Sequence, residues 1–333
     1  MDTRFGIYLN QFRWGGGPAP AELLEQARLA EDAGFDWLVL GDRRVWPAGF
    51  HEVLTTLAWL AAHTRRIKLA TAGLILPLYP PVLLAEALSN LDVLSEGRLI
   101  AGFVLGYRPE EFAAFGVDPR RRVPLFERRL AVIKDLWSRG VADVGGQGQV
   151  RIAPLPVQRP GPPIWGAGRV PVAIRRTARL CDGWTSSFNE EPGELPEKIA
   201  LFRNASRAEG TRGQVVICRD GFTAAAPGRL REVYEGPLLD LFGEYADWKR
   251  TSADAARYRD LSWEGVRSRL VVGPPPAFRE SVHRYAEMGA DGMILRIQPP
   301  GLAQRDALAC LELLGREVLP ALRSPVDASQ PSS

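Results

Sequence analysis

A glycine-rich segment with one arginine is the part of the sequence best suited to hold an anion. A short apolar strand near residue 164 runs into Gly166, Gly168, Arg169 and Val170, and Pro171 stands where a first helical turn would begin. Free N–H groups at a helix start, with the helix dipole behind them, favour a phosphate. Arg169 would add a positive charge, so the segment predicts a phosphate-binding loop. A tight turn without any ligand fits the same spacing.

Asp42 and Arg43 follow another apolar strand, Trp37–Leu40, and are the next candidates for chemistry. An arginine stays charged at any working pH, so Arg43 is a poor general base. It could instead hold an anionic substrate or stabilise developing negative charge. Asp42 could act beside it, or could form a purely structural pair with an arginine. His51 starts the next helix and could reach the same site.

Two further strand ends carry small residues. Ala72 and Gly73 lie at the end of the third apolar run, and Gly106 and Tyr107 follow the fourth. Gly106 allows a sharp exit from the strand, which would place Tyr107 over the site. Small residues at a strand end could also do no more than fill a layer of the core.

Metal chemistry is not expected. The three histidines, His51, His63 and His283, are dispersed and form no HxH or HExxH pattern. The three cysteines lie far apart without a CxxC pair, which is typical of buried thiols in a reducing cytoplasm. Glu110 and Glu111 are interpreted as ordinary acids of a first helical turn, favoured by the helix dipole.

Strand and helix signals alternate along the whole chain, and the strands are nearly all apolar rather than alternating. Such strands are typical of a parallel sheet covered on both faces. Strands are expected at 5–9, 37–40, 67–78, 98–106, 163–166, 182–186, 214–224 and 291–297. One α/β domain, a (β/α)8 TIM barrel over residues 1–323, is favoured over a doubly wound sheet with a second domain. The candidates above then lie where barrel enzymes carry their chemistry, in the loops after the strands.

An insertion around residues 225–264 interrupts this alternation with aromatic and charged residues at helical spacing. Its aromatic residues are Tyr234, Phe242, Tyr245, Trp248, Tyr258 and Trp263. They could form core or an interface, or they could roof a substrate pocket. The sequence leaves both alternatives open.

The overall composition excludes several classes of protein. The 333 residues carry 42 basic and 39 acidic side chains, a net charge of +3 that is too balanced to indicate nucleic-acid binding. No apolar stretch approaches the 18 residues of a membrane span and no signal peptide is evident, so a cytoplasmic protein is expected. The arginines at 120–122 fit a solvated loop or an anion contact near a site mouth. Residues 324–333 have nothing to bury and are expected to be a disordered tail.

Residues 67–116 carry the most specific pattern, because a Pro-rich loop, an Ala/Leu helix, the turn LDVLSEGRL and a GxxxG follow one another. The segments ARLCDGW (178–184) and 272–297 add to it. Together they resemble the bacterial luciferase-like family of flavin- or deazaflavin-dependent oxidoreductases over roughly residues 5–320. The resemblance is weakest in 140–160 and 225–265.

The resemblance implies roles for the residues named above. The loop from Gly166 to Val170 would hold the cofactor phosphate, and Gly106 and Tyr107 would lie on the flavin side. The strand end at Ala72 would pack against the flavin ring, often with a non-proline cis peptide. Arg43 departs from the pattern, since many family members carry a histidine there. That departure puts the usual proton-transfer step in doubt, but not the fold.

We therefore expect a monooxygenase that uses reduced FMN and oxygen on a small organic substrate, with a separate flavin reductase as partner. The alternative is an F420-dependent reductase or dehydrogenase that transfers a hydride without oxygen. A non-catalytic flavin-binding protein is a third possibility, supported by Arg43. An unrelated metal-dependent barrel hydrolase would need clustered ligands, which the sequence lacks. Homodimerisation is common in the resembled family and is expected only on that ground.

Overall fold

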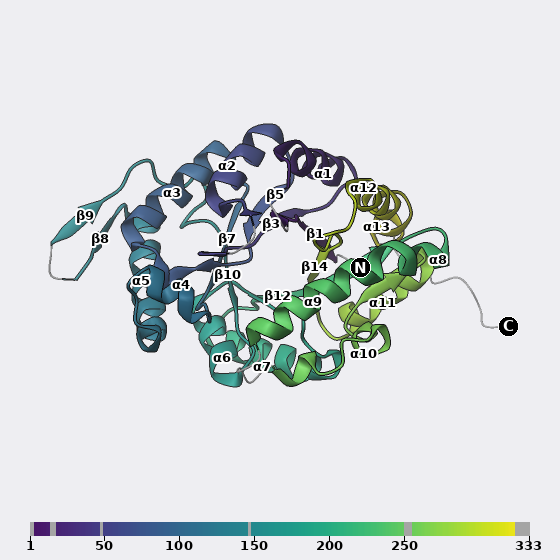
Figure 1. The fold of residues 1–333 in the computed structure, drawn as a ribbon. Coiled ribbons are helices and arrows are strands. Elements are labelled where there is room, and N and C mark those ends of the chain that lie inside the picture. The colour runs from purple at the N-terminus through teal and green to yellow at the C-terminus, as the bar shows by residue number, and fades with distance from the viewer. Residues whose placement is uncertain (1–2, 14–17, 47–48, 146–147, 250–254, 324–333) are drawn as a thin grey trace.

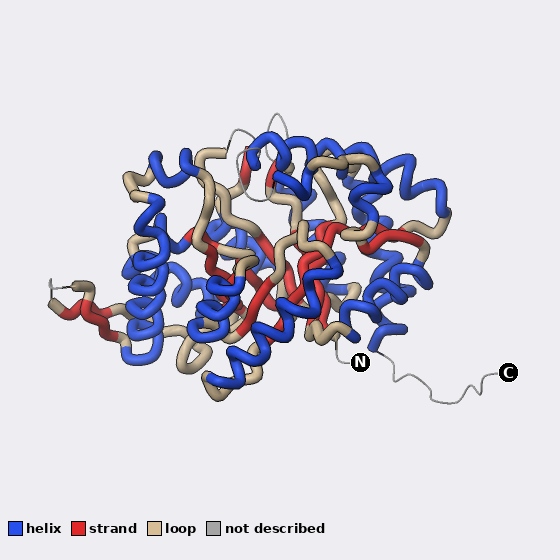
Figure 2. Tube along the Cα trace, turned by 90° about the horizontal axis from the view of Figure 1, so that it is seen from below, coloured by secondary structure: helices blue, strands red, loops and turns tan. Residues whose placement is uncertain are grey.

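The computed structural model describes residues 3–13, 18–46, 49–145, 148–249 and 255–323. The tail predicted for residues 324–333 lies outside the described residues. Figure 1 looks into a central ring of strands surrounded by helices, and Figure 2 shows the same chain turned by 90°.

Eight parallel strands close into a barrel. They are β1 (Arg4–Tyr8), β3 (Trp37–Leu40), β5 (Lys68–Thr71), β7 (Leu99–Val104), β10 (Ile164–Ala167), β11 (Gly183–Thr185), β12 (Gln214–Thr223) and β14 (Gly292–Arg296). Each strand pairs in parallel with the next in this order, and β14 pairs with β1 to complete the circle. The predicted (β/α)8 barrel is confirmed.

Helices form the outer ring of the barrel (Figure 1). The ring consists of α1 (Pro20–Asp32), α2 (Val53–His63), α3 (Pro81–Leu94), α5 (Arg122–Arg139), α6 (Pro171–Leu180), α7 (Leu195–Ala208), α11 (Pro275–Glu287), α12 (Gln304–Leu313) and α13 (Leu319–Arg323). Several begin with proline, whose fixed φ suits a first turn and whose missing N–H is not needed there.

Shorter strands and helices lie in the loops that connect the barrel strands to the outer helices. The strands are β2 (Phe12–Arg13), β4 (Gly49–Phe50), β6 (Leu74–Ile75), β8 (Val141–Asp143), β9 (Gln149–Arg151) and β13 (Val271–Gly273), and the helices are α4 (Pro109–Ala114), α8 (Pro227–Leu230), α9 (Gly236–Lys249) and α10 (Trp263–Arg267). The β8–β9 hairpin projects from one side of the molecule (Figures 1 and 2).

The third apolar run, 67–78, is not one strand. The strand β5 ends at Thr71, the Ala72–Gly73 peptide bond is cis, and the chain resumes as β6 before a 3-10 turn over Leu76–Leu78. Hydrophobicity alone could not show the break, because all three pieces are buried.

Two large indoles fill the inside of the barrel. The rings of Trp37 and Trp165 meet edge to face with centroids 4.9 Å apart. Gly6 and Gly292 make room for Trp37, since a Cβ on Gly292 would lie 2.6 Å from its ring. Burial of an aromatic side chain of this size contributes about 2 kcal/mol or more, so these contacts anchor the barrel from within.

The aromatic residues of the insertion lie in two places, the hydrophobic core and the surroundings of the β2–β4 hairpin. Tyr234 is fully buried and stacks on Phe222 with centroids 4.8 Å apart, and Phe242 is buried as well. Tyr245 is only half-buried and packs with Phe12 and Leu241 against the β2–β4 hairpin. The core alternative thus holds for Tyr234 and Phe242, whereas no described residue of the insertion lines the cavity at the barrel mouth and the pocket-roof alternative stays a prediction.

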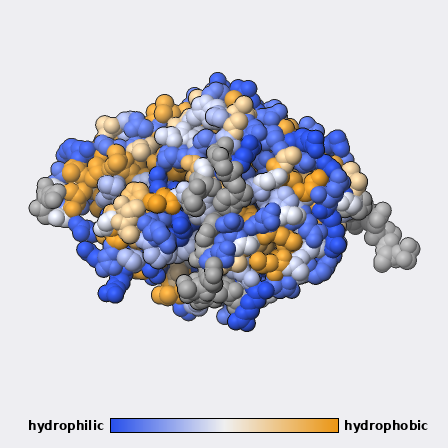
Figure 3. All heavy atoms as spheres, viewed as in Figure 1, coloured by the Kyte–Doolittle hydropathy of each residue, from blue (hydrophilic) through white to orange (hydrophobic). Residues whose placement is uncertain are grey.

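The face drawn in Figure 3 mixes hydrophilic residues with several separate hydrophobic patches. Among the described residues, no helix is long and apolar enough to cross a membrane. Nor does the described part of the chain bring together three or more His, Cys, Asp or Glu side chains that could hold a metal ion.

Candidate active site at the barrel mouth

A cavity of about 520 Å³ opens at the carboxyl ends of the barrel strands. Its walls come from the ends of β1, β3, β5, β7, β10, β11 and β12, which is where barrel enzymes place their chemistry. Ten of the eleven residues singled out from the sequence line it: Asp42, Arg43, Ala72, Gly73, Gly106, Tyr107, Gly166, Gly168, Arg169 and Val170. Segments up to 130 residues apart in sequence therefore meet around one space.

The loop between β10 and α6 borders the cavity from Gly166 to Val170. Its glycines also have a packing reason. A Cβ atom on Gly166 would lie 2.8 Å from Thr177 Cγ2, and one on Gly168 would lie 2.7 Å from Ala173 Cβ. Close contact with α6 therefore requires small residues here, as the tight-turn alternative expects. The same compact turn brings the loop backbone to the cavity wall.

The start of α6 is suited to an anion. The helix begins at Pro171 with no side-chain cap and no acidic residue in its first turn, so the positive end of its dipole is not neutralised locally. Arg169 directly precedes it and pairs through Nε with Oε2 of Glu190 at 3.0 Å. Glu190 is fully buried and also pairs with Lys198. These contacts fix Arg169 at the edge of the cavity.

The turn after β5 forms a smooth wall. Thr71 Oγ1 accepts the N–H of Gly102 at 2.7 Å and donates to its carbonyl oxygen at 2.9 Å. A Cβ on Gly73 would lie 3.0 Å from the carbonyl carbon of Gly102, so two backbones approach closely. Gly106 has a φ of 74°, and a Cβ there would lie 2.5 Å from Ile75 Cγ2. The result is a wall of backbone and small side chains that could receive a flat ring.

Asp42 is held in a structural network. Its Oδ1 pairs with Arg44 Nε at 3.0 Å, and its Oδ2 accepts hydrogen bonds from the Ile75 N–H at 3.0 Å and the Tyr79 hydroxyl at 2.9 Å. Burial raises the pKa of Asp42, although Arg44 opposes the shift. Asp42 thus ties the loop after β3 to β6, and the structural Asp–Arg pair that the sequence left open is present with Arg44.

Glu111 is not the ordinary first-turn acid that the sequence indicated. It has no exposed surface, and its Oε1 accepts the backbone N–H of Arg44 at 2.9 Å. It also lies 3.9 Å from Arg108, and burial raises its pKa. Glu110 is exposed, as expected. Glu111 lies in the first turn of α4, as predicted, but its burial and its bond to Arg44 in the loop after β3 could not be seen in a local pattern.

Arg43 points into the cavity between two aromatic rings. Its guanidinium carbon lies 5.4 Å from the ring centroid of Trp46 and 5.3 Å from that of Tyr107. Cation–π contacts of this kind hold a guanidinium in place without neutralising it. A full positive charge is therefore presented at the mouth, where many relatives were expected to carry a histidine.

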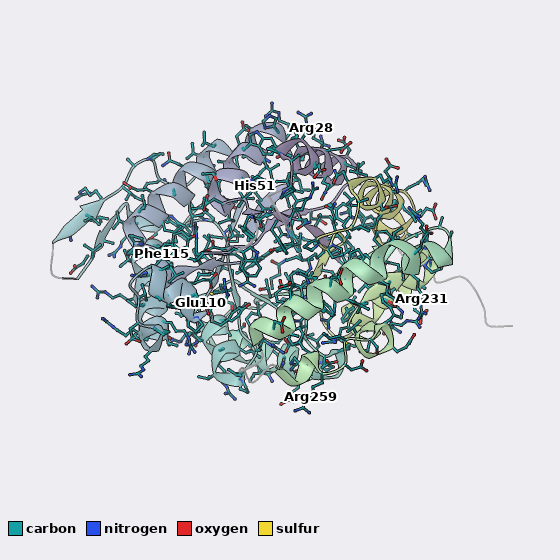
Figure 4. The ribbon with its side chains drawn as sticks, in the orientation of Figure 1. Arg28, His51, Glu110, Phe115, Arg231 and Arg259 are labelled. Atoms are coloured by element: carbon teal, nitrogen blue, oxygen red, sulfur yellow. The ribbon has the colours of Figure 1, made fainter. Side chains whose placement is uncertain are left out.

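His51 is the predicted site residue that does not line the cavity. Its Nε2 lies 2.8 Å from the carbonyl oxygen of Pro18, and its backbone N–H donates to the Gln11 carbonyl at 3.0 Å. It directly follows β4 of the β2–β4 hairpin, and Figure 4 labels it within the ring of helices. Its contacts support a structural role.

A buried ion pair lies behind the mouth and was not predicted. Arg296, the last residue of β14, donates from Nε and Nη2 to the two carboxylate oxygens of Asp220 at 2.6 and 2.9 Å. Its guanidinium also lies 4.5 Å from the ring centroid of Phe188. The available signal was a charged residue within one largely apolar strand, Asp220 in β12, and at the end of another, Arg296 in β14, since such residues are rarely buried without a reason.

Tyr245 of α9 joins this group. Arg296 Nη1 donates to its hydroxyl at 3.3 Å. Burial opposes ionisation of the phenol, but the charges of Arg296 and Arg43 outweigh it and lower the pKa of Tyr245. Burial raises the pKa of the neighbouring Tyr8 to about 12. Two phenols at one mouth thus differ in acidity, and the insertion supplies the more acidic one.

Fold and site together define an α/β-barrel protein with a cofactor-sized cavity at the carboxyl end of its strands. The family model for luciferase-like monooxygenases matches residues 3–292, and the chain belongs to that family. Relatives to which the chain is similar include oxidoreductases that depend on flavin or on F420. The predicted family is thereby confirmed.

Three individual proteins illustrate the range of relatives to which the chain is similar. The chain is 26% identical to an F420-dependent glucose-6-phosphate dehydrogenase from Microbacterium testaceum, over 97% of this chain and 98% of the relative. It is 22% identical to the oxygenase component of a flavin-dependent trigonelline monooxygenase from Acinetobacter baylyi, over 92% and 91%. Among solved structures, monooxygenase RslO1 from Streptomyces bottropensis superposes with a TM-score of 0.79 at 23% identity, covering 96% of this chain and 99% of that chain.

Proposed function

We propose that the protein is a flavin-dependent monooxygenase that uses reduced FMN and oxygen on a small organic substrate. The observation that carries the proposal is one cavity bordered at one side by the anion-suited start of α6 and at another by the smooth wall at Ala72 and Gly73. A phosphate and a flat ring joined by a short chain need those two features in one space.

The residues present fit FMN. The N-terminus of α6 and Arg169 would hold the phosphate, and Gly73 and Gly106 would leave room for the ring. Arg122, at the start of α5, also lines the cavity and would add positive charge on the phosphate side. Reduced flavin would supply the electrons with which one oxygen atom enters the substrate and the other leaves as water.

The chain itself would position the reactants and keep bulk water out. The apolar side chains of Trp165 and Phe188 line the cavity and exclude water from it. Tyr245 does not line the cavity, so we assign it no proton transfer with the substrate; its hydroxyl accepts a hydrogen bond from Arg296 Nη1 at 3.3 Å.

The relative from Acinetobacter is named an oxygenase component, which supports a two-component system. We therefore include a separate flavin reductase as the source of reduced FMN.

A specific observation also favours a second candidate function. The similarity to F420-dependent glucose-6-phosphate dehydrogenases extends over nearly the whole chain at 26–27% identity. In that case the protein would transfer a hydride between F420 and its substrate without oxygen.

Anaerobic titration of the purified protein with reduced FMN and with reduced F420, followed by tryptophan fluorescence, separates the two candidates. Tight binding of reduced FMN and weak binding of F420 supports the monooxygenase. The reverse result replaces it with the hydride-transfer enzyme. Binding without any acceleration of flavin oxidation across a panel of substrates would instead indicate the non-catalytic flavin-binding protein.

A further inference from the structure

The arginines around the mouth differ in whether a carboxylate neutralises them. Four have such a partner within 4.0 Å: Arg44 with Asp42, Arg108 with Glu111, Arg169 with Glu190, and Arg296 with Asp220. Within the described part of the chain, Arg43 and Arg122 have none. Arg122 is exposed at the rim, whereas Arg43 is half-buried. Arg43 therefore faces the cavity without a carboxylate paired to it within 4.0 Å, although the charge of nearby Glu111 acts on it from a greater distance.

Arg43 is held in place from both sides along the chain. The Asp42 carboxylate before it is fixed by Arg44, Ile75 and Tyr79, and the backbone N–H of Arg44 after it donates to buried Glu111. Three separate elements thus restrain the two neighbours of one side chain. Such support is what a preorganised binding group requires, because little conformational freedom remains to be lost when a ligand arrives.

The two rings beside Arg43 restrict where its donors can point. The guanidinium carbon lies over both Trp46 and Tyr107, at 5.4 and 5.3 Å from the ring centroids. A guanidinium stacked on rings keeps N–H donors at its edge, in the planar fork that matches a carboxylate. Trp46 also carries Arg108 over its ring at 5.0 Å, so the indole contacts two guanidinium groups.

Arg43 lies apart from the group that would hold a cofactor phosphate. It follows β3, whereas the anion-suited loop with Arg169 follows β10. In the barrel order β3–β5–β7–β10 the two ends are separated by three strand positions. Adjacent strands lie roughly 4.8 Å apart, so the two strand ends border different parts of the cavity rim. Between them lies the wall at Ala72 and Gly73, which would take the ring.

We propose that Arg43, held between Trp46 and Tyr107, binds a carboxylate of the substrate, so that the protein acts on small organic acids. The inference rests on the proposed function, because it assigns the second charged site of the cavity to substrate once the first is given to the cofactor. Arg43 then determines substrate specificity, instead of marking only the absence of the histidine that the family resemblance led us to expect there.

Benzoate and benzamide provide a matched pair of probes, since they share a shape and differ in charge. Both are titrated calorimetrically into the full-length protein, without and then with saturating FMN. The expected preference for benzoate is about tenfold or more, typical of a hydrogen bond to a charged group. Arg43→Gln should abolish the preference, whereas Arg43→Lys should retain part of it. Arg28→Gln is the matched control, because Arg28 is exposed on the outer side of α1 (Figure 4).

Equal binding of the two probes by the unaltered protein, or undetectable binding of both, would overturn the proposal. A benzoate preference that survives in Arg43→Gln would do so as well, because another cation would then be responsible. FMN affinity is recorded for every variant. Tight FMN binding without a benzoate preference leaves the proposed function standing alone, and a benzoate preference without cofactor binding removes the proposed function but keeps the anion site.

Discussion

Arg169 is the residue whose charge most directly tests the phosphate-binding loop. Replacing it with alanine should weaken binding of reduced FMN by about 1.5–3 kcal/mol, the usual contribution of a hydrogen bond to a charged group. Arg175→Ala is the matched control, because Arg175 lies on α6 and is exposed. Glu190 keeps its contact with Lys198 in the variant, so the fold should be retained. Unchanged affinity would show that the phosphate binds elsewhere.

The phenol of Tyr245 should ionise below the ordinary tyrosine pKa of 10.0. Burial opposes ionisation, but Arg296 and Arg43 lower the pKa by stabilising the phenolate. In a titration of tyrosinate absorbance, Tyr245→Phe should remove the earliest ionising tyrosine. Arg43→Gln should move that ionisation to higher pH, because one of the two charges is lost. Tyr8→Phe is the control, since the pKa of Tyr8 is raised to about 12.

At this scale, sequence reasoning located residues next to glycines and strand ends well, because each was recognisable from its neighbours. His51 does not line the cavity, since the chain forms the β2–β4 hairpin before α2 and the His51 ring contacts the carbonyl oxygen of Pro18. Sequence reasoning missed Arg296 and Asp220, because their pairing joins β14 to β12 and depends on the closed barrel. Long-range pairs of this kind leave no local pattern.

At the scale of elements, Glu31 at the end of α1 anchors the start of β5. Its carboxylate accepts the backbone N–H groups of Arg65, Arg66 and Ile67 at 2.7 to 3.2 Å. Burial opposes ionisation, but these donors lower the pKa of Glu31 below 4.5. Glu31→Gln should reduce the free energy of unfolding by about 1–2 kcal/mol at pH 7 in urea denaturation.

The pH dependence of that effect has a definite sign. A carboxylate with a lowered pKa contributes stability above its unfolded-state pKa, and the contribution is lost as the pH falls through the folded-state value. The difference between the unaltered protein and Glu31→Gln should therefore be full at pH 7 and shrink as the pH falls below about 4.5. Glu312→Gln, on the exposed face of α12, should show neither effect. A constant difference across the range would contradict the role given to Glu31.

The elements themselves were largely predictable, because apolar runs and helical periodicity are local. The exceptions share one cause. The run 67–78 breaks at the cis Ala72–Gly73 bond, and nothing in its hydrophobicity marks the break. Glu111 was assigned to an ordinary helix start, although the helix α4 carries it into contact with Arg44. Both features depend on what the neighbouring strand or loop supplies.

At the scale of the whole molecule, closure of the barrel brings the residues of the candidate site together. Strand β14 pairs with β1, so the last strand of the barrel lies next to the first and Arg296 reaches the group of Tyr8 and Tyr245. The insertion then brings α9 against the β2–β4 hairpin through Leu241 and Phe12. The mouth therefore exists only in the folded chain, and a ligand that binds there should stabilise the fold as a whole.

Thermal unfolding under anaerobic conditions tests this link between cofactor and fold. Reduced FMN at a hundred times its dissociation constant should stabilise the protein by about 2.7 kcal/mol, because it binds only the folded state. Reduced riboflavin at the same concentration should raise the melting temperature much less, since it lacks the phosphate that the α6 N-terminus and Arg169 would hold. In the Arg169→Ala variant, reduced FMN and reduced riboflavin should raise the melting temperature by more similar amounts. Equal shifts from FMN and riboflavin in the unaltered protein would mean that the cavity recognises the ring without the phosphate, and the loop after β10 would then have only the packing role that Gly166 and Gly168 already show.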